Sequence, residues 1–156
     1  MTEAAQENTQ PTFNLEKIYV KDFSLEIPHA PKIFLEREAP QVDVQLHTQA
    51  APIDEGMFEV SVTTTVTAKI GEKVMFLIEA KQAGIFQIRN VPTEELEPIL
   101  AVMCPNILFP YLREVVSDAS VRAGFAPVLL NPINFDMLYQ QQKQQLQAQT
   151  PAPTTH

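Results

Sequence analysis

The run from Phe58 to Gln82 constrains the fold most, because its apolar residues recur at every second position. This period of two is that of a β-strand with one face buried and the other facing water. The alternation stops once, at Gly71-Glu72, and then resumes. A short break with glycine between two alternating runs predicts a β-hairpin. The residues expected on the buried face of the first run are Phe58, Val60, Val62, Thr64, Val66, Ala68 and Ile70.

Two earlier segments also alternate and predict two further strands. Val42, Val44 and Leu46 mark one of them, which follows a loop interrupted by three prolines that a central strand does not tolerate. The other runs from Phe13 to Ile27. Its apolar face is expected to carry Phe13, Leu15, Tyr19, Phe23, Leu25 and Ile27, and its opposite face Asp22, Ser24 and Glu26.

After Gly84 the apolar spacing changes to about 3.6 residues, which is typical of an amphipathic helix. Thr93 is the expected N-cap of a first helix and Gly124 its C-cap, while Asn134 is the expected N-cap of a second helix. Prolines at positions 98, 105 and 110 are expected to kink or divide the first helix. Its apolar stripe comprises Ile107, Leu108, Tyr111, Leu112, Val115, Val116 and Ala119.

Strands followed by helices predict an α+β fold, with a four-stranded antiparallel sheet and two helices packed on one face. The 156 residues suit a single domain, which we place at 13–140. Residues 1–12 are polar, and residues 141–156 form a tract rich in Gln, Pro and Thr. Both ends are predicted to be disordered.

Composition excludes several classes of protein. A net charge of −8 disfavours nucleic acid and anionic membranes as partners. One cysteine permits no internal disulfide, so a cytoplasmic location is expected. We find no signal peptide, and no apolar run that approaches the roughly 20 residues of a membrane span, so no membrane insertion is expected.

The sequence lacks catalytic motifs, so we expect that the protein is not an enzyme and binds neither a cofactor nor a metal. No phosphate-binding loop or dinucleotide fingerprint occurs, and the three histidines lack the spacing of metal ligands. Cys104 is a nucleophile if a histidine folds beside it, but its neighbours Met103 and Pro105 favour a buried thiol.

Asp22 and Glu26 share a face of the first predicted strand. Four residues of strand separate them by about 13 Å, which is too far for direct proton transfer. From the residues alone they are either solvated side chains or part of an acidic docking surface.

Four segments together resemble the SecB family of export chaperones. They are Ile18-Tyr19-Val20-Lys21-Asp22 with the residues up to Pro31, Gly84-Ile85-Phe86, Cys104-Pro105-Asn106-Ile107-Leu108-Phe109-Pro110-Tyr111, and Pro132-Ile133-Asn134-Phe135-Asp136-Met137-Leu138-Tyr139. They occur in the family's order from about Phe13 to Tyr139.

The resemblance implies a homotetramer, built as a dimer of dimers, that acts without ATP. Such a protein binds unfolded secretory precursors, keeps them competent for translocation and delivers them to the motor SecA. A general holdase, or a chaperone of the same fold linked to a toxin-antitoxin system, is the alternative, because a fold does not define the client.

The resemblance also implies two sets of site residues. The surface for SecA maps to Asp22, Glu26, Leu77 and Glu79. The client groove maps to Phe34, Val42, Val44, Leu46, Leu138 and Tyr139. The alternation leaves open whether the three residues of the second strand line a groove or belong to the core. Some members have an acidic tail that contacts the motor, whereas residues 147–156 here carry no acidic residue.

Overall fold

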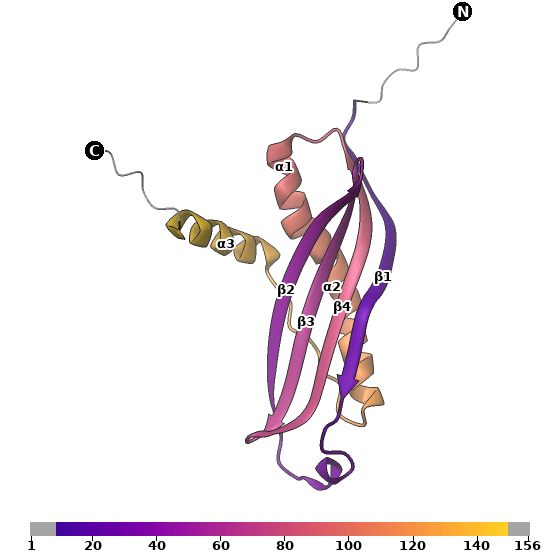
Figure 1. Ribbon diagram of the computed structural model, residues 1–156, viewed down its shortest axis with the longest axis vertical. Coiled ribbons are helices and arrows are strands. Elements are labelled where there is room, and N and C mark those ends of the chain that lie inside the picture. The colour runs from indigo at the N-terminus through magenta and orange to yellow at the C-terminus, as the bar shows by residue number, and fades with distance from the viewer. Residues whose placement is uncertain (1–8, 150–156) are drawn as a thin grey trace, which may run out of the picture.

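The computed structural model describes residues 9–149, and its long axis follows a sheet of four strands (Figure 1). The strands are β1 (Thr12–Glu26), β2 (Gln41–Asp54), β3 (Met57–Ile70) and β4 (Lys73–Arg89). Neighbours pair antiparallel in the order β1-β4-β3-β2, which confirms the predicted sheet. Within the described part of the chain, β1 and β2 are therefore its edges.

The predicted hairpin is present between β3 and β4. Ile70 pairs with Lys73, and Gly71 between them has a φ of 59°. Such a left-handed conformation favours glycine, because it has no Cβ to clash with the backbone. The predicted inner face of β3 is also confirmed, with Val60, Val62 and Val66 fully buried.

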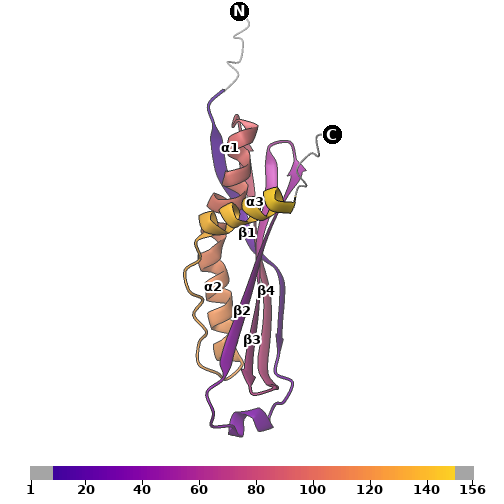
Figure 2. The ribbon, with the colours of Figure 1, turned by 90° about the vertical axis from the view of Figure 1, so that its left-hand side faces the viewer.

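One continuous helical run covers a single face of the sheet (Figure 2). It consists of α1 (Thr93–Pro98), the π-helical segment η2 (Ile99–Met103) and α2 (Cys104–Arg122). Pro98 and Pro105 flank η2, and each removes a backbone donor from the helical ladder. The prolines therefore coincide with a wider turn rather than a break between two helices.

The C-terminus of α2 carries the predicted glycine. Gly124 has a φ of 92°, and its N–H donates to the carbonyl of Val121. The N–H of Phe125 donates to the carbonyl of Ser120. This pair of bonds is a Schellman motif, which ends the helix and turns the chain back along it.

The core lies between α2 and the two central strands. Leu108, Leu112 and Val116 of α2 are fully buried. Gly84 on β4 allows the close approach, since a Cβ at this position would lie 3.0 Å from Leu108 Cδ2. Tyr111, on the predicted apolar stripe, is 51% exposed instead. The stripe is therefore only partly covered by its own sheet.

The helical run Thr93–Arg122 is long and apolar enough to cross a membrane by length and composition alone. The expectation that no such run exists is wrong by this measure. Core helices of globular proteins satisfy the same measure, and this one packs on the sheet through Leu112 and Val116.

The last helix, α3 (Phe135–Gln149), differs from the prediction in two respects. It contacts η2 and extends beyond β2, so it does not lie on the sheet face (Figure 1). It also continues nine residues into the predicted disordered tail, because glutamine is a good helix former. Asn134 caps it as predicted, through a 3.0 Å bond from the N–H of Met137 to Asn134 Oδ1. Residues 1–8 and 150–156 lie outside the described residues.

Strand β1 corrects the predicted position of Tyr19. The register with β4 shifts between Leu15 and Lys17 and again between Val20 and Asp22. Each β-bulge adds one residue and reverses the alternation. Tyr19 therefore lies on the outer face, where its hydroxyl donates to Glu59, while Lys21 Nζ lies 2.6 Å from the other oxygen of that carboxylate.

Candidate functional site

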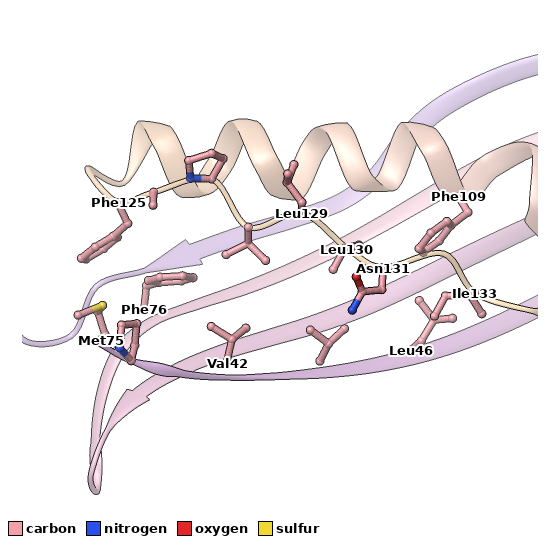
Figure 3. Close-up of a pocket in the computed structure, with 15 residues that line it drawn as sticks. Val42, Leu46, Met75, Phe76, Phe109, Phe125, Leu129, Leu130, Asn131 and Ile133 are labelled. Atoms are coloured by element: carbon pink, nitrogen blue, oxygen red, sulfur yellow. The ribbon is translucent and has the colours of Figure 1, made fainter. Parts of the chain in front are cut away.

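An apolar groove runs along the inner face of β2 (Figure 3). Its volume is about 670 Å³, and its opposite wall is the segment that joins α2 to α3. Strand β2 contributes Val42, Val44 and Leu46, β4 contributes Met75 and Phe76, and the joining segment contributes Phe125 to Asn131 and Ile133. Phe109 of α2 and Pro40 complete the lining, which contains no charged side chain.

The groove exists because the helix covers only part of the sheet. The packing of α2 is against β4 and β3, and β2 lies beyond it at the edge. Val42 and Val44 are therefore 45% and 44% exposed, although they face the same side of the sheet as the buried Val66 of β3.

Polar side chains of α2 hold in place the opposite wall of the groove, which is the segment that joins α2 to α3. Arg113 Nε donates to the carbonyl of Leu130 over 2.8 Å, and the N–H of Val128 donates to Ser120 Oγ over 2.9 Å. Because buried backbone groups need partners, these bonds fix a segment that has no regular secondary structure. The wall is thus an ordered surface that can present apolar side chains.

Three aromatic rings close one end of the groove. The ring of Phe125 stacks on Phe76 at 4.9 Å and on Phe34 at 5.1 Å between centroids. Phe34 belongs to the 3-10 helix η1 (Lys32–Leu35) in the connection between β1 and β2. Gly124 makes room for it, because a Cβ there would lie 3.0 Å from the Phe34 ring.

The structure brings together only part of the groove predicted from the sequence. Val42, Val44 and Leu46 all line it; Val42 and Val44 are nearly half exposed, whereas Leu46 is half-buried and also packs against the core. Phe34 stacks at its end but does not line it. Leu138 and Tyr139 lie on α3 outside the lining, and Tyr139 is buried with Lys143 Nζ 5.0 Å from its ring centroid.

Sequence reasoning missed the segment from Phe125 to Ile133. Its letters, FAPVLLNPI, are too apolar for an ordinary surface loop, and two prolines prevent a helix. Leu129 is 68% exposed. An apolar, proline-containing stretch between two helices was the signal that could have identified this wall.

The four residues assigned to the motor surface lie together on the outer face of the sheet. Glu26 pairs with Leu77, and Ser24 pairs with Glu79 two residues along the ladder. Asp22 lies two residues further and pairs with Lys81. Because β1 and β4 are neighbours within one chain, a single copy brings all four residues to one face. We call Asp22, Glu26, Leu77 and Glu79 the outer acidic patch.

Cys104 is fully buried at the start of α2. Burial raises the pKa of its thiol to about 12, so the thiolate is not populated near neutral pH. A nucleophile needs that thiolate, and the surroundings of Cys104 do not favour it. No cluster of potential metal ligands occurs among the described residues.

An edge strand whose apolar side chains remain open beside an ordered apolar wall is the arrangement of a protein that binds extended polypeptide. Comparison with known families agrees with this class. Residues 6–146 match the family of the preprotein translocase subunit SecB. The chain belongs to the SecB family of protein-export chaperones.

Two relatives show how close the match is. The protein-export protein SecB of Methylobacillus flagellatus is 60% identical over 154 residues, which cover 99% of this chain and 98% of the relative. The SecB of Nitrosomonas europaea is 63% identical over 147 residues, which cover 93% and 89%.

A solved structure agrees in fold. The SecB-like chaperone of Mycobacterium tuberculosis, in complex with a ChAD peptide from the HigA1 antitoxin, aligns with a TM-score of 0.65 and 18% identity. The alignment covers 78% of this chain and 90% of that one.

Proposed function

We propose that the chain holds unfolded secretory precursors in its apolar groove, without ATP, and delivers them to SecA in the cytoplasm. The observation that carries this proposal is the open inner row of β2. Val42 and Val44 remain nearly half exposed beside an ordered apolar wall. Burying such side chains against a client removes apolar surface from water, which favours binding by about 25 cal/mol per Å² of buried area.

An extended client fits this edge by its backbone as well. Within the described residues, β2 pairs on one side only, with β3. Alternate N–H and C=O groups of an edge strand point outward, and a client strand can satisfy them while its side chains alternate between groove and solvent. Backbone contacts carry no sequence preference, which suits a protein with many clients.

Assembly into a homotetramer, as a dimer of dimers, is the second part of the proposal. Phe13, Val20 and Phe23 are exposed on the inner side of edge strand β1. Tyr111 is exposed on α2. Copies of one chain usually associate through closed symmetry. A dimer of dimers needs two different interfaces, and the exposed apolar residues of β1 and of α2 provide apolar surface for one interface each. Several grooves on one assembly then hold one precursor by avidity, although each contact stays reversible.

Delivery to the motor is the third part. The outer acidic patch lies on the face of the sheet opposite to the groove, so a precursor and the motor can bind at once. Thr65 Oγ1 lies 3.4 Å from Glu79 Oε1, within weak hydrogen-bond distance. Exposed carboxylates around Leu77 suit a basic partner surface with an apolar contact at its centre.

The proposed function is tested by diluting an unfolded secretory precursor into buffer without ATP and following its aggregation. We expect suppression that saturates at a fixed ratio of assembly to precursor. Added SecA should bind the loaded assembly. Suppression without SecA binding supports a general holdase instead, and no suppression contradicts the proposal.

A further inference from the structure

Lys81 is a basic residue inside the outer acidic patch. It follows Glu79 by two residues on β4, and it pairs across the strands with Asp22 of β1 and Thr63 of β3. Side chains two apart on a strand share a face, so Lys81 and Glu79 both point to the outer side of the sheet. Lys81 is half-buried, which is typical of a lysine whose alkyl stem lies along a surface while its ammonium reaches water.

Two carboxylates beside Lys81 are bonded to other groups. Asp22 Oδ1 accepts from the N–H of Phe23 over 3.0 Å. Both oxygens of Glu59 accept from side chains of β1; the bond from Lys21 lowers the pKa of Glu59 most, and the charge of Lys81 adds a smaller contribution. The side chain of Lys81 itself makes no hydrogen bond and no ion pair within residues 9–149. Its ammonium is therefore available to a group outside the chain.

The outer face of β4 presents three kinds of side chain in a fixed order. Leu77 is apolar, Glu79 is acidic and Lys81 is basic, and the register with both neighbouring strands is regular over this stretch. Alternate residues of a strand are about 7 Å apart, so the three side chains form a row about 13 Å long. Because the strand fixes these separations, the row can distinguish partner segments by the order of their side chains and not only by their net charge.

A complementary partner segment has an apolar, a basic and an acidic side chain in the same order. An extended segment that lies along β4 presents such side chains at every second residue, which matches the spacing of the row. A carboxylate opposite Lys81 gains a charge-assisted hydrogen bond. A uniformly basic segment instead places like charge on Lys81, which disfavours that segment although the rest of the patch attracts it.

We propose that Lys81 is a specificity-determining residue of the outer acidic patch, which selects a segment of SecA that carries a carboxylate beside its basic residues. This inference rests on the proposed delivery to SecA, and it names the chemistry of the segment that binds. A patch with acidic residues alone accepts any basic segment, including those of clients. The free ammonium of Lys81 excludes such segments, so the patch stays available to the motor while the groove holds a precursor.

The test is the sign of the change in SecA affinity when Lys81 is replaced. Lys81→Gln removes the contact to the partner's carboxylate, so SecA should bind about threefold more weakly, and Lys81→Glu should weaken binding about tenfold because it adds repulsion. A patch that only attracts basic segments predicts tighter binding, since each change makes it more acidic. Titration of fluorescently labelled SecA with the full-length assembly, followed by anisotropy, measures both. Equal or tighter binding of Lys81→Glu would overturn the inference.

Lys17→Glu is the matched control for this charge change. Lys17 is exposed on β1, and its pairing partner Ile85 lies on the outer row of β4, four residues beyond Lys81. That separation is about 13 Å, which exceeds the Debye length of about 10 Å at about 0.1 M salt. Lys17→Glu should therefore leave SecA affinity within about twofold at this salt concentration. A loss equal to that of Lys81→Glu would show that position does not matter, and the inference would fail.

A double variant separates the order of the charges from their sum. Glu79→Lys combined with Lys81→Glu keeps the net charge at −8 and inverts only the order along the row. SecA should bind this variant at least about tenfold more weakly, whereas unchanged affinity would reject the inference.

The fold and the client groove provide the remaining controls. Client binding and the urea midpoint should be those of the unsubstituted protein in every variant, and a shifted midpoint in Lys81→Gln would mean that Lys81 acts through the fold instead. Failure of the unsubstituted protein to bind SecA would reject the proposed delivery, and the role of Lys81 with it. Tighter SecA binding by Lys81→Glu would reject the role of Lys81 alone.

Discussion

Strands β2 and β3 lie side by side, and each directs apolar side chains to the same face of the sheet. On β3 this row is core, and Val62 and Val66 have no exposed surface. On β2 the row is open, with Val42 and Val44 nearly half exposed. The difference arises from coverage rather than sequence, because α2 packs on β3 and β4 and stops short of the edge strand. One sheet is thus covered at its centre and open at its edge, where we propose that clients bind.

The largest expected effect is on the covered side of this comparison. Leu112→Ala removes a fully buried side chain from the contact between α2 and the sheet. We expect the free energy of unfolding to fall by about 3 kcal/mol, from lost burial and the cavity that remains. Urea unfolding followed by circular dichroism measures this. A loss below about 1 kcal/mol would mean that α2 is not packed as described.

On the open row of β2, substitution should affect client binding more than stability. The double substitution Val44→Ser and Leu46→Ser removes apolar surface from the groove, so affinity for an unfolded precursor should fall about tenfold. The free energy of unfolding should fall by less than about 2 kcal/mol, since Val44 is exposed and Leu46 is only half-buried where it packs against the core. Binding is measured by fluorescence anisotropy, after confirming that the variant and the unsubstituted protein have the same assembly mass. Unchanged affinity with lost stability would place these residues in the core after all.

The outer face sharpens the comparison, because we propose that its charges bind a different partner, SecA. Glu79→Lys reverses one charge of the outer acidic patch, and we expect SecA to bind about three- to tenfold more weakly at low salt. The difference should shrink at high salt, which screens exposed charges. Glu72→Lys makes the same change in the exposed β3–β4 turn and is the control. Precursor binding should be normal in both variants.

The smallest effect concerns Glu59 on the outer face. Its hydrogen bond from Lys21, followed by that from Tyr19, lowers its pKa below the ordinary 4.5. A lowered folded pKa means that the stabilisation is present above about pH 4.5 and is lost as pH falls through the folded value. Glu59→Gln should therefore cost stability at pH about 6 and less at pH about 3, by under about 1 kcal/mol because Lys21 is partly exposed. A difference independent of pH, in urea unfolding at both pH values, would contradict this.

Local chemistry predicted much of the fold. The alternation of β3, the turn at Gly71, the glycine after α2 and the cap at Asn134 depend on near neighbours, and each appears as predicted. The bulges of β1 did not follow from alternation, because an inserted residue leaves no mark in composition. Tyr19 was therefore assigned to the wrong face.

The site was harder to predict than the fold, because coverage is a tertiary property. Alternation identified the face of Val44 but not whether a helix lies over it. Leu138 and Tyr139 were placed in the groove, whereas the wall is formed by the preceding segment with Leu129 and Ile133. That segment has no period from which a secondary structure could be assigned. Its position depends on long-range bonds such as that from Arg113 to Leu130.

The central claim is that the open row of β2 binds unfolded polypeptide in an assembled chaperone. Native mass spectrometry, with and without a denatured secretory precursor, tests assembly and binding in one measurement. We expect a mass of about four times 17.5 kDa, and a further species heavier by one precursor that disappears in the Val44→Ser, Leu46→Ser variant. A 17.5 kDa monomer whose mass the precursor leaves unchanged would contradict the account.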